Sequence, residues 1–127
     1  MKIYRIGSKD NVKPFIYFQD IETQSIAEAS LLTEDFLPGT KGMYFFNRLK
    51  SNNPVKGGGT KVLRQLLEYS EQVGIPILNQ VSAYGNLSQK DLIAFYKKHG
   101  FVSFSSEFGD DLLVYYPKNK VWKSENL

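Results

Sequence analysis

The sequence contains no cysteine, a single histidine and no long apolar run, and each of these absences excludes a class of protein or site. Without cysteine there are no disulfides, no thiolate metal ligands and no cysteine nucleophile. The lone histidine, His99, cannot form a histidine metal cluster, so no metal is expected. No apolar run approaches the roughly 20 residues that a membrane helix needs. The sequence therefore predicts a soluble, cytoplasmic protein without a membrane partner.

The composition is that of one globular domain. The 127 residues are 42% hydrophobic and 23% charged, a mixture that supports a single core. We expect one domain over residues 1–117 and a polar C-terminal tail over 118–127. The net charge of +3 suits an anionic ligand or reflects ordinary surface lysines. It falls short of the clustered basic face of a nucleic-acid binder, so a nucleic-acid partner is not expected.

The first half of the chain reads as strands joined by turns. Aromatic and β-branched runs predict strands at 2–6, 14–19 and 43–51, and the Pro-Gly pair predicts a turn over 37–42. Residues 23–34 have a helical composition but an alternating apolar pattern, and we favour a strand there. Alternation in the third strand places four residues on one face: Met43, Phe45, Asn47 and Leu49.

The second half alternates helix with strand. From Thr60, apolar residues recur at helical spacing, and Gly74 is expected to end the helix in a left-handed conformation. A short strand follows at 75–83. Ser88 caps a second predicted helix, with Asp91 three residues on, and Gly100 ends it. Its apolar stripe consists of Leu92, Phe95, Tyr96 and His99. Runs at 101–106 and 110–118 complete a strand-rich α+β order.

Three consecutive glycines precede the first helix. A glycine loop that enters a helix N-terminus can bind an anion, because the first helical N–H groups lack intrahelical partners. Lys56 and Lys61 could add charge and the Thr60 hydroxyl a hydrogen bond. The alternative is a flexible turn without a ligand. The spacing matches neither the nucleotide-triphosphatase loop nor the dinucleotide fingerprint.

Two segments resemble signatures of the GNAT superfamily of N-acyltransferases. "PVKGGGTKVL" is similar to the pyrophosphate loop, with Gly57 and Gly59 as its motif glycines, and "DLIAFYKKHGFVSF" is similar to a second signature at the expected distance. The resemblance covers residues 43–104. It implies a mostly antiparallel, twisted sheet with a splayed centre and about two main helices. Pro54 departs from the Gln/Arg of the loop motif, and the two helices that usually follow the first strand are missing.

The resemblance implies acetyl-CoA as acyl donor and a set of cofactor-binding residues. Tyr96 matches the family's proton donor for the departing thiolate, although its spacing also suits a core aromatic. Asn86 matches either a cofactor-contacting asparagine or a turn residue. The implied cofactor-binding residues are Leu49, Ser51, Lys56, Gly57, Gly58, Gly59, Thr60, Lys61 and Asn86.

No general base is assigned from the sequence. The predicted strand 43–51 contains no carboxylate. Glu28, Glu34 and Asp35 are interpreted as solvated surface charges, and His99 as a helix-end residue that interacts with the dipole.

The leading hypothesis is an acetyl-CoA-dependent N-acetyltransferase in which an unknown amine attacks directly in a ternary complex. The alternative is a non-catalytic CoA-binding or interaction module on the same fold. A nucleic-acid-binding domain ranks last. A homodimer stays open, because the aromatic-rich terminal strands could pair between subunits.

Overall fold

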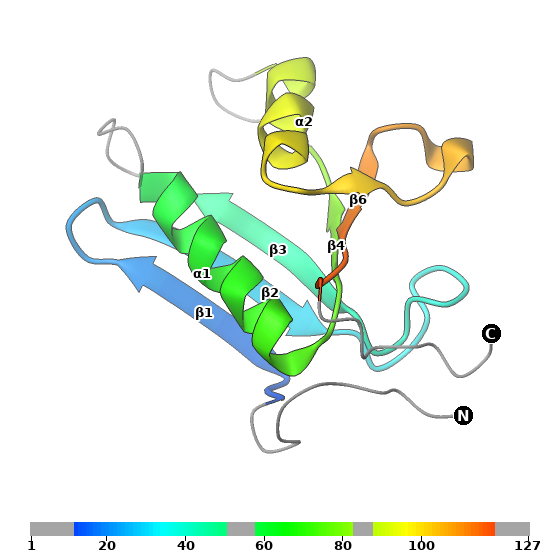
Figure 1. The fold of residues 1–127 in the computed structure, drawn as a ribbon, viewed down its shortest axis with the longest axis horizontal. Helices are drawn as coiled ribbons and strands as arrows, with labels where there is room; N and C mark the ends of the chain where they lie inside the picture. The colour runs from blue at the N-terminus through cyan, green and yellow to red at the C-terminus, as the bar shows by residue number, and fades with distance from the viewer. Residues whose placement is uncertain (1–11, 51–57, 83–87, 119–127) are drawn as a thin grey trace.

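The computed structural model describes residues 12–50, 58–82 and 88–118, and shows one mixed sheet with helices (Figure 1). The predicted strand at 2–6 lies outside the described residues. In chain order the elements are β1 (Phe15–Asp20), β2 (Ser25–Leu31), β3 (Tyr44–Lys50), α1 (Gly58–Val73), β4 (Ile77–Gln80), α2 (Gln89–Lys98), β5 (Val102–Ser103), the 3₁₀ helix η2 (Ser106–Phe108) and β6 (Leu112–Tyr115).

The sheet is mostly antiparallel, as the family resemblance implies, and it is split near its centre. Its six strands run in the order β1-β2-β3-β4-β6-β5. The parallel contact between β3 and β4 joins Tyr44 to Ile77 and Phe45 to Leu78, and the register ends there. Beyond this junction the two strands diverge. The splayed centre of the predicted fold is therefore present.

Both helices pack on one face of the sheet. In Figure 1, α1 crosses β1, β2 and β3, while α2 lies toward β4 and β6. Side chains of both helices belong to the larger hydrophobic core, together with Ala27, Tyr44 and Leu113 from three strands. Among the described residues no helix precedes α1, in agreement with the two helices predicted to be missing. None of the described helices has the length and apolar composition that a membrane crossing needs.

The opposite face of the sheet has a smaller core that the loop between β2 and β3 partly covers. Its buried residues are Met43, Leu78, Leu112 and Val114, and Leu32 and Leu37 of the loop pack against them. Thr40 organises this loop, since its Oγ1 accepts from Phe36 N at 2.9 Å and from Leu37 N at 3.0 Å. The predicted turn over 37–42 is thereby confirmed.

The two helices form where the apolar spacing predicts them. In α1 the residues Val62, Leu63 and Leu66 are fully buried, and Gly74 ends the helix at φ 71°. Ser88 caps α2, because its Oγ accepts from Asp91 N at 3.1 Å. The left-handed backbone at Gly100, with φ 100°, turns the chain from α2 into β5, a conformation that favours glycine.

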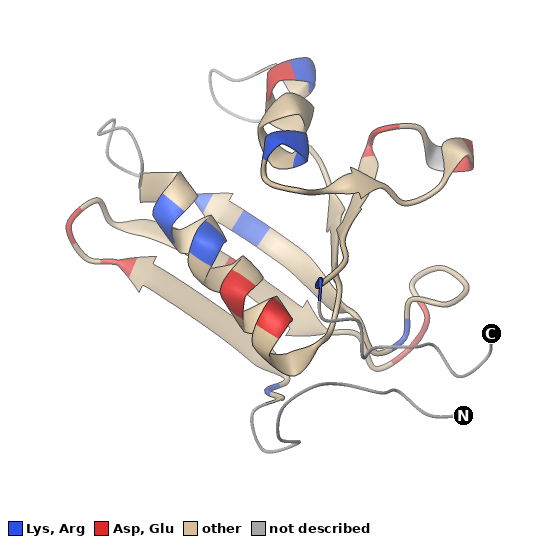
Figure 2. Ribbon diagram, viewed as in Figure 1, with Lys and Arg blue, Asp and Glu red and all other residues tan. Residues whose placement is uncertain are grey.

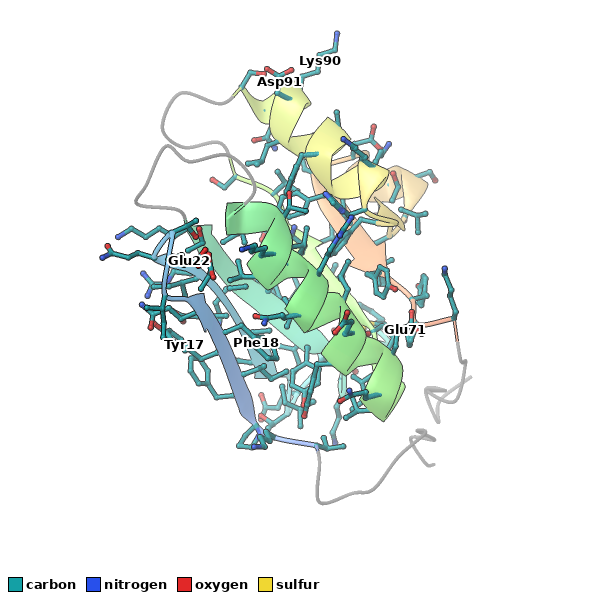
Figure 3. All side chains as sticks on the ribbon, turned by 60° about the vertical axis from the view of Figure 1, so that its left-hand side comes forward. Tyr17, Phe18, Glu22, Glu71, Lys90 and Asp91 are labelled. Carbon is teal, nitrogen blue, oxygen red and sulfur yellow. The ribbon has the colours of Figure 1, made fainter. Side chains whose placement is uncertain are left out.

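Segment 23–34 is a strand over its central part, as favoured by its alternating pattern. β2 pairs with β1 from Phe15 opposite Ser30 to Asp20 opposite Ser25. Ala27 and Ala29 are fully buried under α1. On the partner strand, Phe18 packs on the same core whereas Tyr17 is 46% exposed on the other face (Figure 3). Small residues on β2 thus let α1 lie close to the sheet.

The prediction that Leu49 shares a face of β3 with Phe45 is wrong. The register between β2 and β3 shifts, so that Glu28 pairs with Arg48 while Ala29 pairs with Phe46, which leaves Asn47 as a bulged residue. The extra residue reverses the alternation beyond it. Leu49 consequently packs on the larger core with Phe46, not on the face of Phe45.

The last two strands are shorter than predicted, and a side chain of α1 holds the end of the described chain. β5 has 2 residues and η2 occupies part of the segment that precedes β6. Glu71 of α1 accepts from Tyr115 Oη at 2.5 Å and from Lys118 N at 2.8 Å (Figure 3). Burial and this carboxylate raise the pKa of Tyr115. The division into a domain over 1–117 and a tail stays a prediction.

Candidate functional site

The splay between β3 and β4 opens into a cavity of about 380 Å³. One wall is the divergent part of β3, the other is the end of β4, and α2 closes the inner side. The lining residues are Phe46, Asn47, Arg48, Leu49, Lys50, Asn79, Gln80, Val81, Ser82, Leu92 and Tyr96. Because the cavity comes from a break in strand pairing, backbone groups and side chains of both strands face it.

Tyr96 lies in the cavity wall and in the hydrophobic core at once. Its side chain is 4% exposed. The ring makes edge-on contacts with Phe46, Phe95 and Phe101, at centroid separations of 5.8, 5.3 and 5.4 Å. Its interpretation as a core aromatic is confirmed, and its role as a proton donor stays a prediction. Packing on three rings fixes the orientation of the ring, which suits a group that must present its hydroxyl at one point.

The N-terminus of α1 lies beside this cavity. Leu49 lines the cavity, and its Cδ2 would be 3.9 Å from a Cβ placed on Gly59 in the first turn of α1. No acidic residue occupies that first turn. The first N–H groups of α1, which lack intrahelical partners, and the positive end of the helix dipole thus lie next to the splay.

The charges along α1 are arranged against the helix dipole. Lys61 and Arg64 lie in its first half, and Glu68 and Glu71 in its second half (Figure 2). In α2 the order is the reverse and favourable, with an acidic residue in the first turn and basic residues in the last. Basic side chains near an N-terminus cost helix stability. A bound anion at the N-terminus of α1 would offset that cost.

Gly58 is required by packing, which the sequence alone did not reveal. A Cβ at this position would lie 2.3 Å from Ser25 Oγ and 2.4 Å from Thr23 Oγ1. Both hydroxyls are buried and lie 2.8 Å apart, and Thr23 Oγ1 donates to Asp20 Oδ2 at 2.6 Å. This bond lowers the pKa of Asp20. Gly58 therefore lets the start of α1 contact the β1–β2 hairpin directly.

The cavity walls in the described part of the chain contain basic and neutral residues but no carboxylate. Arg48 and Lys50 supply the positive charge. Glu28, interpreted from the sequence as a solvated surface charge, has a side chain only 15% exposed and accepts from Arg48 Nε at 2.5 Å. It thus holds the arginine at the cavity wall. The ion pair balances the charge of Arg48, so Lys50 is the lining residue that can attract an anionic ligand.

Asn79 is a cavity residue that the sequence reasoning missed. It lies in an apolar strand, is 4% exposed, and its Nδ2 has no hydrogen-bond partner among the described residues. The available signal was an asparagine at an inward position of a buried strand, since Asn79 shares its face with Ile77.

The other predicted site residues fall into two groups. Thr60 and Lys61 follow the glycines in the first turns of α1, where Lys61 Nζ is 3.8 Å from Glu22 Oε2 of the β1–β2 turn. Positions outside the described residues are Ser51, Pro54, Lys56, Gly57 and Asn86. Their proposed contacts stay predictions. In the described residues no group of acidic or histidine side chains could hold a metal ion.

His99 lies at the end of α2, away from the lining of the cavity. Its backbone N–H donates to Tyr96 O at 3.0 Å, and its ring packs on Phe95 at a centroid separation of 4.9 Å. Burial lowers the pKa of His99, and the nearby positive charges of Arg64 and Lys98 lower it further. The neutral imidazole is therefore favoured near neutral pH.

Comparison with known proteins supports the fold. No protein-family model and no curated protein sequence matches the chain. The crystal structure of the anti-CRISPR protein AcrVA5 is similar at a TM-score of 0.64 and 15% identity, over 81% of this chain and 99% of that chain. This likeness shows the fold, and the mostly antiparallel sheet with a split centre is GNAT-like.

A second solved structure is a putative acetyltransferase from the GNAT family from Bacteroides thetaiotaomicron. Its TM-score is 0.49 at 22% identity, over 87% of this chain and 66% of that chain. At such identities a structural likeness shows a fold but not a substrate.

Proposed function

We propose that this protein is an N-acetyltransferase that moves an acetyl group from acetyl-CoA to an amine in a ternary complex. The observation that carries this proposal is the cavity in the strand splay, which adjoins the N-terminus of α1 through Leu49 and includes Tyr96 in its wall. CoA has the matching chemistry, because its diphosphate needs N–H donors and positive charge while its pantetheine arm can lie along a strand.

The residues divide into cofactor binding and proton transfer. The first turn of α1, with Gly58, Gly59, Thr60 and Lys61, would hold the diphosphate, and Leu49 would contact the arm. The amine nitrogen attacks the thioester carbonyl carbon, the new C–N bond forms and the C–S bond breaks. The amine loses a proton to solvent or to the acceptor site, and Tyr96 gives a proton to the departing thiolate.

Exclusion of water strengthens these interactions. Tyr96 and Leu92 close the inner side of the cavity, so a thioester there would lie in a medium of low polarity. Lys50 in the cavity wall suits the anionic cofactor. The neutral form of the acceptor amine is the one that attacks. The walls contain no carboxylate in the described residues, so the proposal assigns no protein base.

A second candidate function is a non-catalytic CoA-binding module on the same fold. The lack of a carboxylate in the described walls favours it, as does the membership of Tyr96 in the hydrophobic core. Both functions require the same cofactor site and differ in the chemistry that follows binding.

Thermal unfolding with acetyl-CoA and turnover with an amine panel test the proposal. Saturation at about 100 times Kd would stabilise the protein by roughly 2.7 kcal/mol, while ATP at the same concentration should give a smaller shift. Release of free CoA that requires an amine would establish the transferase.

Tyr96→Phe separates the enzyme from the binding module. The variant keeps the ring contacts and removes the hydroxyl, so we expect kcat to fall about 100-fold with acetyl-CoA affinity little changed. Phe95→Leu, which alters the neighbouring ring but not the hydroxyl, is the control for disturbed packing. Full activity of Tyr96→Phe would remove Tyr96 from the mechanism, and failure of the wild type to bind acetyl-CoA would reject both functions.

A further inference from the structure

Asn79 has a buried amide nitrogen whose surroundings in the described protein do not satisfy it. Its Nδ2 has no hydrogen-bond partner among the described residues, and the residue is 4% exposed. Buried polar groups are almost always paired, so an exception calls for an explanation such as a missing ligand. The residue lines the cavity in the splay.

The position of Asn79 on β4 explains which way its side chain points. Phe45 opposite Leu78 is the last pair between β3 and β4, so Asn79 is the first residue of β4 beyond the junction, as Phe46 is on β3. Its side chain lies on the face of Ile77, and its partner across the sheet is Leu113. Both belong to the larger core beneath the helices. The amide therefore points to the helix side of the sheet, at the place where β3 and β4 separate. Leu92 and Tyr96 line the cavity there.

Neighbouring amides show that this situation is particular to Asn79. Asn47, across the cavity, donates from Nδ2 to Ser30 Oγ at 2.7 Å. Gln80, the next residue on β4, is exposed and can bond to water. Gln89 donates from Nε2 to Val81 O and to Asp111 Oδ1, each at 3.0 Å. In contrast, Asn79 combines burial, a free donor and a place in the cavity wall.

We propose that Asn79 Nδ2 donates a hydrogen bond to the thioester carbonyl oxygen of bound acetyl-CoA. This inference rests on the proposed function, which puts the sulfur beside Tyr96. Tyr96 packs edge-on against Phe46, and Phe46 and Asn79 are the first residues beyond the last strand pair. The Tyr96 hydroxyl of α2 and the Asn79 amide of β4 would therefore approach the thioester from different elements. An amide N–H aimed at the carbonyl oxygen would stabilise the negative charge that develops there during attack.

Under this proposal Asn79 recognises the acyl group, whereas other residues recognise the CoA part of the cofactor. The diphosphate and pantetheine are shared by acetyl-CoA and free CoA, but only acetyl-CoA has the thioester oxygen. A donor directed at that oxygen should make the protein prefer the loaded cofactor over the spent one. Product release is then favoured, because CoA loses this bond when the acyl group leaves.

The test measures acetyl-CoA and CoA affinities by calorimetry for the full chain and for Asn79→Leu. Leucine has a similar shape without the unpaired donor, so we expect the Tm of the free protein to stay level or rise. Affinity for acetyl-CoA should fall about tenfold. Affinity for CoA should change by less than about twofold, and kcat should fall at least about tenfold.

Two further variants keep the test decisive. Asn79→Ala removes the donor with a smaller side chain and should show the same selective loss if Asn79→Leu does not fold. Gln19→Leu changes an exposed amide on β1 that does not line the cavity, and it is the matched control for the change from amide to apolar.

Three results would overturn the inference. Equal losses for acetyl-CoA and CoA would mean that the amide contacts the pantetheine arm. Unchanged affinity and kcat together with a lower Tm would make Asn79 a purely structural residue. If the wild type binds neither cofactor, the proposed function fails and the inference fails with it, an outcome that the wild-type titration alone identifies.

Discussion

Gly58 and Gly59 are adjacent in sequence, yet the structure predicts opposite consequences for the same substitution. Neither glycine has a positive φ, so an alanine is not excluded by the backbone at either position. The difference lies in the space around the added Cβ. At position 58 it would lie 2.3 Å from Ser25 Oγ, whereas at position 59 the nearest atom, Leu49 Cδ2, would be 3.9 Å away.

The expected loss of stability in Gly58→Ala can be estimated from its contacts. Overpacking costs roughly 1–3 kcal/mol. Displacement of Thr23 or Ser25 would break hydrogen bonds worth about 1 kcal/mol each. The higher helix propensity of alanine returns up to about 1 kcal/mol. The net destabilisation is about 2 kcal/mol, which lowers Tm by roughly 8 °C in a chain of this size.

Gly59→Ala should leave the free protein as stable as the wild type or raise its Tm by up to about 4 °C, because its Cβ makes only an ordinary contact. Acetyl-CoA affinity should nevertheless fall about tenfold, since the Cβ projects beside Leu49 at the cavity wall. Thermal unfolding and calorimetric titration of both variants are the assays. A wild-type Tm in Gly58→Ala would refute the packing argument, and wild-type acetyl-CoA affinity in Gly59→Ala would refute the anion site at α1.

Two further predictions concern groups outside the cavity. The single histidine gives one imidazole titration by NMR, and burial should put the pKa of His99 below its ordinary value of 6.5. The native state then binds fewer protons than the unfolded chain, so stability should fall as pH drops through this range, less so in His99→Gln; a pKa above 6.5 would contradict this. Glu71→Ala removes the acceptor of Tyr115 Oη and Lys118 N and should cost about 1–3 kcal/mol in chemical denaturation. In a Tyr115→Phe background the stability lost on Glu71→Ala should be smaller. If the two losses simply add, Glu71 and Tyr115 do not stabilise the protein through their hydrogen bond.

The elements that depend on local pattern were predictable from the sequence. α1 has apolar residues at helical spacing and a terminal glycine, and α2 has a capping serine, so both helices begin and end close to their predicted limits. The strand assignment of segment 23–34 also followed from alternation. Each of these signals lies within one element and does not require knowledge of its neighbours.

The features that depend on contacts between distant segments were not predictable. The bulge at Asn47 follows from the register between β2 and β3, which no single strand encodes. The tight packing at Gly58 involves hydroxyls of a hairpin more than 30 residues earlier in the chain. The unpaired amide of Asn79 becomes visible only once burial and partners are known.

The short parallel junction between β3 and β4 divides the strand pairing of the described sheet into two blocks. One block contains β1, β2 and β3, the other β4, β5 and β6, and the described sheet joins them at Tyr44–Ile77 and Phe45–Leu78. Because the strand pairing between the blocks is short, we expect amides near this junction to exchange through smaller openings than amides inside each block. A ligand in the splay would contact both blocks, and its binding would slow exchange in each of them at once.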